Sequence, residues 1–464
     1  MNTRIEKDNL GEHEIPSEVY WGIHTSRAIA NFNISDYKVS PILIKALAMV
    51  KLACCIANYE LKYFDKIIAE AIIKSCEEII EGQFPDQFPI DAMQGGAGTS
   101  TNMNMNEVIA NRALEILGYE RGQYEIINPI GHCNLHQSTN DVYPTALKIA
   151  SILQIRQLSE AIAGLQGALQ KKEHDFADIM TIGRTEMQDA VPITLGGQFS
   201  SFSEAIARDR WRTFKCEERL RTVNIGGTAV GTGLTAPQNY IFLVIEKLRQ
   251  ITNLGLTRAE TLLDQTANAD VFVEVSGILN AHGTNLIKIA DDLRLLHFLR
   301  EIKLPSVQTG SSIMPGKVNP VITEATISVG LKVNSNTQLI ANCASRGSLQ
   351  INEFLPLIAF AILETIELLT NTDKMLEKHV SGIEANPEMC RKYFENNEML
   401  ITAFLPEIGY EKAEEIIDEY QNTPKQNFRE FLQSKLGSDM VSNVLSPGNL
   451  MSLGFREKYN GEKG

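Results

Sequence analysis

The sequence predicts an all-α protein built around long helices. Apolar residues recur every three or four positions over Ile155–Leu169, Val275–Leu296 and Ile362–Leu376, which is the spacing of one helix face. Alternating apolar runs bounded by turn residues, which are typical of strands, are nearly absent. A helix over about 265–300 would be about 50 Å long, too long for one compact globule to cover. We therefore expect these helices to pack side by side in a bundle, within one chain or across several chains.

The elements predicted before the bundle are shorter. Residues 1–36 carry no clear period and are expected to be irregular, with a turn at Asn9–Gly11. The helices predicted next cover about 41–60, 66–82 and Glu107–Leu117. The long helical pattern begins at about residue 141. With 464 residues and a hydrophobic fraction of 44%, the chain can bury a large core and exceeds a typical single domain.

The charge balance excludes some classes of partner. The formal net charge is -14 and the isoelectric point is about 5.2, which argues against binding to nucleic acid or to an anionic membrane. The net charge does not describe a pocket, because cations gathered locally can still bind an acidic substrate.

The cysteines and the N-terminal residues predict a cytoplasmic protein. Seven cysteines, an odd number without a Cys-x-x-Cys pair, favour reduced thiols over a disulfide framework. The first residues, MNTRIEKDNLGEHEIP, are charged and lack an apolar stretch, so we expect neither a secretion signal nor a membrane anchor. No uninterrupted apolar run reaches the length of a membrane span, so no membrane partner is expected.

The segment Gly310–Pro320 combines two serines, a lysine and an asparagine with two glycines and two prolines. Glycine permits backbone angles closed to other residues and proline fixes them, so such a loop can be mobile as a whole and shaped at its tip. A small anion would suit its polar side chains, those of Ser311, Ser312, Lys317 and Asn319. One of the serine hydroxyls could also act as a base. On composition alone, an ordinary polar loop explains the segment equally well.

Three further polar clusters interrupt the helical pattern. Gln94–Asn104 is a glycine-rich turn before a helix, where N–H groups and the helix dipole favour an anion, and it lacks the Gly-Lys-Ser/Thr ending of a P-loop. Asn134–Asp141 is a run of hydrogen-bonding side chains at an expected helix start, which N-cap preferences also explain. Gly183–Pro192 lies between the first two long helices. In a bundle, such clusters can meet only at helix ends or where neighbouring chains bring them together.

The sequence does not predict a metal or cofactor site. His132 and His136 have a spacing that could ligate a metal, but no third ligand accompanies them. The regular apolar stripes are better explained as core seams than as cofactor-binding faces. We therefore expect no bound metal.

The segment GSSIMPGKVNP at 310–320 resembles the signature of the aspartase/fumarase superfamily, lyases that add or remove water or an amine across the double bond of fumarate. The segments QGGAGTSTNMN, HQSTNDVYPT and GRTEMQDAVP are similar to the other conserved blocks of these enzymes, and the similarity runs from about residue 3 to about 410. The resemblance implies a homotetramer with a central 20-helix bundle and active sites shared by three subunits. It also implies three domains, an N-terminal domain at 1–140, a central domain at 141–390 with a lid at 310–320, and a small C-terminal helical domain at 391–464.

The resemblance also implies roles for individual residues. Ser311 would be the catalytic base. One carboxylate of the substrate would be held by Lys317 and Asn319, and the other by the hydroxyl groups of Thr99, Ser138, Thr139 and Ser312. The leaving amine would be met by Asn140 and Thr185, and Arg27 would contribute to the same site. Removing a proton beside a carboxylate builds an enediolate with a second negative charge, which oriented donors of these types would stabilise.

Three features resemble the ammonia-lyase branch of the superfamily more than its hydratase branch. They are the opening stretch TRIEKDNLGEHEIPSEVYWGIHTSRAIANF, Thr139 within Ser138–Asp141, and Val321 after Asn319–Pro320. The resemblance implies reversible deamination of L-aspartate to fumarate and ammonia without a required cofactor, although a divalent metal could activate it. The alternatives are a class II fumarate hydratase, a lyase acting on a substituted aspartate, and a non-catalytic structural member of the family.

Two departures from the family pattern bear on the substrate. Glu186 stands where relatives carry His or Gln, and the resemblance places it next to Glu324. Because like charges disfavour joint ionisation, one of these carboxyl groups would keep its proton, and the remaining charge would favour an ammonium leaving group. The second departure is the connector after Asp292–Leu296, which is shorter than in relatives and changes the expected geometry of the lid.

Overall fold

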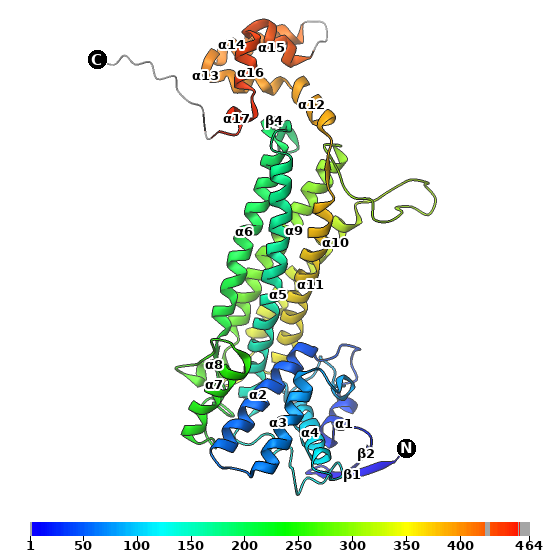
Figure 1. Ribbon diagram of the computed structural model, residues 1–464, viewed down its shortest axis with the longest axis vertical. Helices are drawn as coiled ribbons and strands as arrows, with labels where there is room; N and C mark the ends of the chain where they lie inside the picture. The colour runs from blue at the N-terminus through cyan, green and yellow to red at the C-terminus, as the bar shows by residue number, and fades with distance from the viewer. Residues whose placement is uncertain (1, 423–426, 453, 455–464) are drawn as a thin grey trace, which may run out of the picture. The chain divides into compact units, whose positions relative to one another are not determined.

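The computed structural model describes residues 2–422, 427–452 and 454 (Figure 1). Over these residues most of the chain is helical, and the strands form short two-stranded ladders. The predicted all-α class is therefore confirmed.

The strands are scattered along the chain, and the helices fall into three successive groups. The strands are β1 (Thr3–Asp8), β2 (Gly11–Pro16), β3 (Met180–Thr185), β4 (Gln188–Thr194), β5 (Thr222–Val223), β6 (Thr257–Arg258), β7 (Ile302–Lys303) and β8 (Glu384–Ala385). The N-terminal helices are α1 (Ile23–Asn31), α2 (Pro41–Glu60), α3 (Lys66–Ile80), the 3-10 helix η1 (Pro85–Gln87) and α4 (Thr99–Ile116). The long helices are α5 (Thr139–Asp175), α6 (Leu195–Leu220), α9 (Asp270–Phe298), α10 (Val321–Ala344) and α11 (Leu355–Ser381), with the shorter α7 (Gln238–Thr252) and α8 (Leu262–Ala267) before α9. The C-terminal helices are α12 (Pro387–Asn396), the 3-10 helix η2 (Glu398–Phe404), α13 (Leu405–Ile408), α14 (Tyr410–Gln421), α15 (Phe428–Leu436), α16 (Ser438–Val444) and α17 (Pro447–Leu450).

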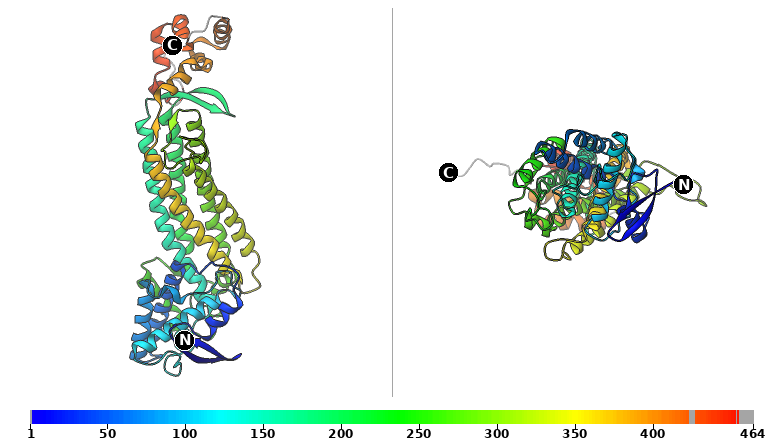
Figure 2. Two further views of the ribbon diagram at one scale, coloured as in Figure 1. Left: turned by 90° about the vertical axis from the view of Figure 1, so that its right-hand side faces the viewer. Right: turned by 90° about the horizontal axis from the view of Figure 1, so that it is seen from below.

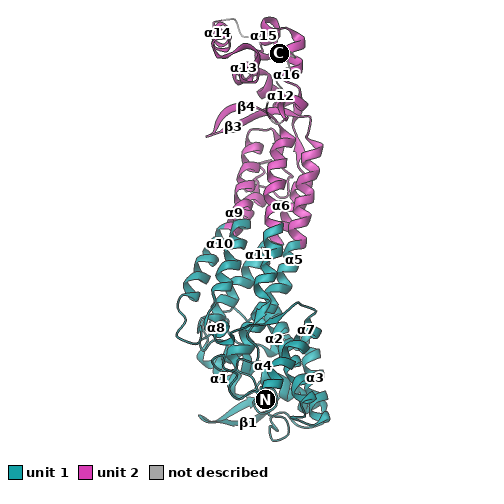
Figure 3. Ribbon diagram, turned by 90° about the vertical axis from the view of Figure 1, so that its left-hand side faces the viewer, with its two compact units in different colours: residues 1–159, 211–283, 331–370 teal, residues 160–210, 284–330, 371–464 magenta. Residues whose placement is uncertain are grey.

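The chain forms two compact units (Figure 3). Unit 1 comprises Met1–Ser159, Trp211–Gly283 and Leu331–Thr370, and unit 2 comprises Glu160–Arg210, Thr284–Gly330 and Asn371–Gly464. Each of the five long helices contributes residues to both units. The three-domain division at 140 and 390 stays a prediction.

In unit 1 the N-terminal helices pack on one another and on segments of the long helices. Helix α2 packs against α3 and α7, and α4 packs against α1 and α3. Arg156 of α5 donates to both carboxylate oxygens of Glu217 in α6, at 2.8 and 2.9 Å. Asn336 of α10 donates to Glu364 of α11 at 2.8 Å. These polar contacts fix which faces of neighbouring helices meet.

In unit 2 the segments of the long helices lie side by side, and the β3–β4 hairpin joins α5 to α6 (Figure 2). Helices α5 and α11 approach closely, because a Cβ added at Gly164 would lie 2.5 Å from the Glu377 carboxylate. The C-terminal helices share a separate apolar cluster that includes Phe404, Phe428 and Leu432, and Ile182 of β3 belongs to the same cluster.

The predicted apolar stripes are core seams. Leu296 is half-buried, whereas the other repeating residues are at most 1% exposed, namely Ile155, Leu158, Ile162, Leu165, Leu169, Val275, Leu279, Leu286, Ile289, Leu293, Ile362, Ile366, Leu369 and Leu376. The five long helices found among the described residues would make twenty in four chains, but the tetramer itself stays a prediction.

The expected irregular N-terminus was wrong, although the turn at Asn9–Gly11 was right. Strands β1 and β2 pair antiparallel around Asn9 and Leu10, with Asp8 opposite Gly11, and α1 follows. The alternation of side chains was hidden in the sequence because charged residues occupy both faces of β1. Glu6 is only 4% exposed, since it is buried by polar contacts rather than by apolar ones.

Two helix boundaries also differ from the prediction. Helix α4 begins at Thr99 rather than Glu107, because polar residues of its first turns, such as Asn102 and Asn104, are buried and hydrogen-bonded. The helix expected over 265–300 is two helices, because the backbone of Asn268 is extended, with φ -105° and ψ 143°, between the end of α8 and the start of α9 at Asp270. The helices expected at 41–60 and 66–82 are α2 and α3.

Two helices, α2 and α11, are long and apolar enough to cross a membrane by length and composition alone. Their most apolar windows are 72% and 67% buried within the fold, as expected of core helices. The C-terminal helical prediction includes residues 423–426, 453 and 455–464, which lie outside the described residues.

Candidate active site

The glycine-rich turn brings the start of α4 close to α5. Gly98 is the N-cap of α4 and has a φ of 93°, in the left-handed region. A Cβ at this position would lie 2.4 Å from the ring of Tyr143. Thr99, the first helical residue, is exposed and donates its hydroxyl to the Gly96 carbonyl at 2.8 Å. The turn therefore presents Thr99 at a helix N-terminus, where backbone N–H groups favour an anion.

The predicted cluster Ser138–Asn140 forms the N-terminus of α5. Ser138 Oγ accepts a hydrogen bond from the Asn140 N–H at 3.2 Å, and the Asp141 carboxylate accepts from the Ser138 N–H at 3.0 Å. Ser138 is therefore the N-cap of α5, with Asp141 bonding back to it from the first turn, so the N-cap interpretation of the cluster is correct. It does not exclude a functional role, because the helix dipole still favours an anion at this end.

Asn140 is held on two sides by the loop that follows β5. Its side-chain amide donates to the Ala229 carbonyl at 2.7 Å. Its own carbonyl accepts from the Asn224 side chain at 2.9 Å. This carbonyl lacks the usual helical partner because Pro144, four residues later, has no N–H. Asn224 was missed in the sequence, and Pro144 within a helix was the available signal.

Asp141 also binds the loop that follows β5. Its Oδ2 accepts from the N–H groups of Gly226 and Thr228, at 3.2 and 2.9 Å. Burial raises the pKa of Asp141 to about 6, against the opposite effect of hydrogen bonds from Ser138, Thr228 and Gly226. The carboxylate therefore ties the start of α5 to the glycine-rich loop, a structural role that sequence reasoning did not assign.

A buried polar network lies behind Thr139. Asn102 of α4 donates to Thr139 Oγ1 and to Asn134 Oδ1, each at 3.1 Å. Lys51 of α2 donates to Asn134 at 2.9 Å and to Gln137 at 2.8 Å. Burial lowers the pKa of Lys51 to about 8. This network fixes the Asn134–Thr139 segment from its inner side.

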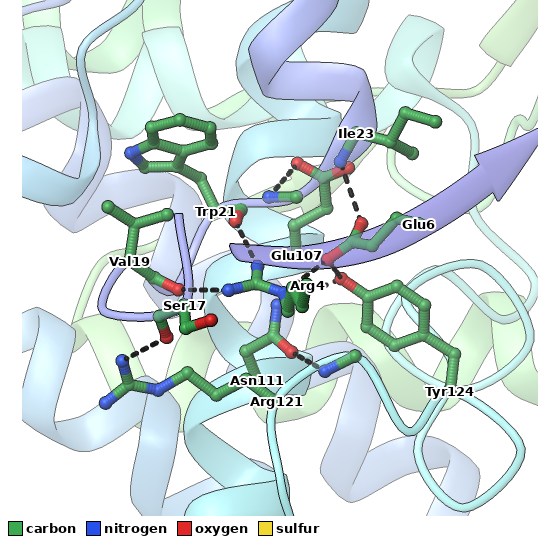
Figure 4. A network of polar contacts seen from close by, with 12 residues as sticks. Arg4, Glu6, Ser17, Val19, Trp21, Ile23, Glu107, Asn111, Arg121 and Tyr124 are labelled. Atoms are coloured by element: carbon green, nitrogen blue, oxygen red, sulfur yellow. Dashed lines mark hydrogen bonds and ion pairs between the residues drawn. The ribbon is translucent and has the colours of Figure 1, made fainter. Parts of the chain in front are cut away.

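Arg27 lies on α1, whose N-terminus is capped by two carboxylates (Figure 4). Glu6 accepts from the Ile23 N–H at 2.8 Å, and Glu107 accepts from the N–H groups of Gly22 at 2.8 Å, His24 at 2.8 Å and Thr25 at 3.1 Å. Burial raises the pKa of Glu107. Because α1 and α4 are joined in this way, Arg27 has a fixed position relative to the start of α4.

Arg27 and Thr99 line one pocket of about 730 Å³ together with Lys7 and His24. Asp8 already engages Arg27, at 2.8 Å to Nε and 2.9 Å to one terminal nitrogen. The structure thus brings two predicted site residues together, but a large part of the Arg27 guanidinium is committed to Asp8.

Thr185 and Glu186 lie at the exposed tip of the β3–β4 hairpin. Glu186 and Met187 have φ values of 51° and 60°, which is the conformation of a two-residue hairpin turn. Glu324 lies elsewhere in the same unit, in the first turn of α10, and its side chain is exposed. The predicted proximity of Glu186 and Glu324 stays a prediction.

The lid residues 310–320 form a loop whose two ends are joined by hydrogen bonds. The Gly310 N–H donates to the Lys317 carbonyl at 2.7 Å, and the Asn319 side chain donates to the Gly310 carbonyl at 2.9 Å. A Cβ at Gly310 would lie 2.7 Å from the backbone nitrogen of Asn319, so the two ends of the loop can approach this closely only with glycine at this position. Ser312 and Lys317 are exposed, and Ser311 is half-buried.

Ser311 Oγ accepts hydrogen bonds from two backbone N–H groups of the lid, those of Ile313 at 3.2 Å and Met314 at 2.9 Å. Ser311 and Lys317 also line one hollow of about 400 Å³ within the loop. The lid therefore brings the predicted base and the predicted cation together.

His132 and His136 make other contacts. Nδ1 of His132 accepts from the Asn128 N–H at 2.9 Å, and Nδ1 of His136 lies 2.7 Å from Asn58 Oδ1. Within the described ranges no group of three or more His, Cys, Asp or Glu residues is arranged to hold a metal ion.

Comparison with known proteins identifies the chain as a lyase. The sequence model of the family described as "Lyase" matches residues 11–334, and the chain belongs to this family. The predicted superfamily membership is therefore confirmed.

Curated relatives cover nearly the whole chain. A protein of Bacillus sp. named aspartate ammonia-lyase is 43% identical over 96% of this chain and 97% of its own length. The protein of the same name from Escherichia coli K12 is 41% identical over 98% of both chains. Among solved structures, a "fumarate lyase:delta crystallin" from Brucella melitensis bound to cobalt has a TM-score of 0.94 at 44% identity, covering 97% of this chain and 100% of that one. A class II fumarase from Schistosoma mansoni has a TM-score of 0.89 at 30% identity, covering 96% and 98%.

Proposed function

We propose that the protein is an ammonia-lyase that converts L-aspartate reversibly to fumarate and ammonia. The observation that carries the proposal is the match to relatives named aspartate ammonia-lyase at 41–43% identity over nearly the full length of both chains. A small dicarboxylate substrate also agrees with the polar segments, which offer hydroxyl groups, one lysine and two helix N-termini.

Ser311 is the proposed base that removes the Cβ proton. A serine hydroxyl is ordinarily a poor base, so a negative charge on Oγ must be stabilised. The Ile313 and Met314 N–H groups point at this oxygen and provide such stabilisation. The electron pair of the broken C–H bond moves into the neighbouring carboxylate as an enediolate. Its collapse forms the double bond of fumarate and breaks the C–N bond, which releases ammonia.

Two sets of donors would hold the substrate carboxylates. Lys317 is the proposed cation of the first set, and Asn319, which already donates once to Gly310, has a second amide hydrogen to offer. The second set consists of the hydroxyl groups of Thr99, Ser138, Thr139 and Ser312. Ser138 and Thr139 stand at the N-terminus of α5, whose dipole adds to the attraction for an anion.

Asn140 and Thr185 are the proposed partners of the leaving amine. Because the Asn140 amide nitrogen donates to the Ala229 carbonyl, its Oδ1 faces outward from that bond as an acceptor. An amine or ammonium is a donor, so it matches this oxygen. Arg27 is proposed to act at the edge of the site, beside Thr99.

The one negative charge that remains on the pair Glu186 and Glu324 is proposed to favour an ammonium over a neutral leaving group. The contribution of charge is tested by Glu186→Gln, which keeps the shape of the side chain. The proposal expects a fall in kcat for aspartate, and unchanged turnover would contradict it.

We infer that four chains assemble and that each active site uses three of them. Large apolar side chains exposed in the single chain support a further interface, since Trp211 is 64%, Phe214 59% and Leu331 61% exposed. Light scattering on the purified protein should give four times 51.6 kDa.

We place the enzyme in the cytoplasm and propose that it needs no cofactor. Its activity should therefore survive dialysis against a chelator, with divalent metal acting at most as an activator.

The first test is a spectrophotometric assay of fumarate formation from L-aspartate, with L-malate in parallel. Ser311→Ala should reduce turnover by about 1,000-fold, the range expected for loss of a general base. Fumarate from malate alone would contradict the proposal and favour a hydratase, as in the Schistosoma mansoni neighbour. No product from either substrate would point to a substituted aspartate or to a non-catalytic member of the family.

A further inference from the structure

Thr185 and Glu186 stand at the tip of a two-stranded hairpin, which is marginally stable on its own. Their position must therefore be fixed by contacts between the hairpin and the rest of unit 2. Arg184, the residue before Thr185, pairs with Asp189 next to the tip and makes such contacts. Because successive side chains of a strand point to opposite faces, an anchor at Arg184 leaves Thr185 on the other face.

Arg184 makes contacts in several directions within unit 2. Its terminal nitrogen NH1 donates to both carboxylate oxygens of Glu301, each at 3.1 Å, and to the Ile182 carbonyl at 3.2 Å. Its Nε donates to Asp189 of β4 at 3.0 Å. Its guanidinium carbon lies 5.0 Å from the ring centroid of Tyr393 in α12. A lysine could not satisfy these contacts together, because it carries a single point charge without a planar fork.

Glu301 is the buried partner of Arg184 and lies in the segment that leads from α9 to the lid. It is 0% exposed and directly precedes β7, after which the chain continues to the lid. Its carboxylate also accepts from the Thr181 hydroxyl of β3, and its carbonyl accepts from the Asn386 N–H at 2.8 Å. A fully buried carboxylate needs a cation and hydrogen-bond donors, and Arg184 supplies the cation.

We propose that Arg184 and Glu301 are positioning residues for Thr185. The pair fixes the hairpin, close to its tip, to the residue before β7 and to α12, and thereby sets where Thr185 stands when it meets the leaving amine. Neither residue contacts the substrate. This inference rests on the proposed function, because it assigns the pair to the same ammonia-lyase reaction.

Steady-state kinetics with L-aspartate test the pair in the full-length protein. Arg184→Lys and Glu301→Gln should each lower kcat by about 10-fold or more, because small misplacements of a reacting partner are costly. The KM should change by less than about 3-fold, since the carboxylate-binding groups lie on other segments. The control is Lys303→Gln, which breaks an exposed ion pair with Glu384 of 3.4 Å on the neighbouring strands and should leave kcat within about 2-fold.

A double-substitution cycle separates positioning from general destabilisation. If Arg184 acts through Thr185, then Arg184→Lys should lower kcat much less in a Thr185→Val background than in the wild type. Equal effects in both backgrounds, or a wild-type kcat for Arg184→Lys, would overturn the proposal.

Circular dichroism establishes that each variant is folded before it is assayed. Should the buried substitutions prevent folding, Asp189→Asn weakens the exposed contact of Arg184, together with the hydrogen bond that Asp189 accepts from Asn397, and leaves Glu301 in place. A kcat lowered about 2- to 5-fold is expected, and unchanged kcat would again contradict the proposal. Wild-type protein that does not convert aspartate would contradict the proposed function. Active wild type with unaffected variants would contradict the positioning role alone.

Discussion

At the scale of single residues, the candidate site depends on polar side chains that support other polar side chains. Asn224 is fully buried and donates to the Asn140 carbonyl at 2.9 Å and to the Thr266 hydroxyl at 2.9 Å. It compensates for the N–H that Pro144 lacks. A residue of this kind is conspicuous in the structure and hidden in the sequence, because its role depends on a partner 84 positions away.

Asn224→Ala should lower both stability and activity. The substitution leaves the partly buried Asn140 carbonyl, and the buried Thr266 hydroxyl, without the Asn224 donor, which costs about 1–3 kcal/mol of unfolding free energy. Asn140 should then be held less firmly, so kcat for aspartate should fall. Urea unfolding and aspartate kinetics measure the two effects.

The matched control is Asn268→Ala, an exposed asparagine of the same unit that donates to Asp264 at 2.8 Å. Its unfolding free energy should stay within about 0.5 kcal/mol of wild type. Equal stability of the Asn224 and Asn268 variants would contradict the role assigned to Asn224.

Glu217 makes stability depend on pH in the acid range. Its hydrogen bonds with Arg156, and then with Arg221, lower its pKa to about 2 from an ordinary value of 4.5. A carboxyl group with a lowered folded-state pKa stabilises the fold above its ordinary pKa, and this contribution is lost as pH falls from about 4.5 to 2. The two arginine side chains are 46% and 41% exposed, so after screening we expect about 1–2 kcal/mol.

Urea unfolding of wild type and Glu217→Gln at pH 7 and pH 3 measures this contribution. The difference in unfolding free energy between the two proteins should shrink at pH 3. Glu218→Gln is the control, since Glu218 is 61% exposed and its ion pair with Lys215 is weak. A difference that is the same at both pH values would show that Glu217 does not carry the effect.

At the scale of elements, helices with a periodic apolar face were the easiest to predict from the sequence. Elements that bury polar side chains were the hardest. The stripe residues of the long helices were predictable because a buried apolar face repeats every three to four residues. Strand β1 and the first turns of α4 were not predictable. Their buried side chains, such as Glu6 and Asn102, are polar and are stabilised by partners far away in the sequence. The local sequence contains no sign of such partners.

The same distinction applies to the candidate site. Resemblance to a family indicated Ser311 and Ser138 by their motifs, which are local. The arrangement around them was not visible, because Asp141, Asn224 and Glu301 act through loops and strands distant in the chain. Arg184 was within a quoted motif, but its partner Glu301 lies 117 positions away.

Gly98 is the residue that lets α4 begin against α5. Gly98→Ala would add a Cβ 2.4 Å from the Tyr143 ring and would also place alanine at a φ of 93°. We expect a loss of about 2–4 kcal/mol of unfolding free energy and a higher KM for aspartate, because Thr99 must move.

Gly118→Ala separates the backbone effect from the steric one. Gly118 has a similar φ of 82° with no atom within 4 Å of an added Cβ, so only strain of about 1 kcal/mol is expected. Thermal or urea unfolding of both variants gives the comparison. Equal losses would show that contact with Tyr143 is unimportant.

At the scale of the whole molecule, shared active sites make a quantitative prediction about mixed assemblies. Ser311 lies on the lid and Thr185 on the hairpin tip, and we expect the proposed tetramer to supply them to each site from different chains. A Ser311→Ala chain still carries an intact hairpin, and a Thr185→Val chain still carries an intact lid. A site that takes its hairpin from the first and its lid from the second contains both functional groups.

Mixing the two impaired variants should therefore restore activity. If equal amounts are unfolded together and refolded, random assembly gives about one quarter of sites with both groups intact, hence about one quarter of wild-type turnover. Each variant refolded alone is the control and should keep its low turnover. If each chain supplied both groups to the same site, every site would contain one lesion and the mixture would keep the low turnover of the single variants. The recovered fraction thus measures directly whether one active site draws on more than one chain.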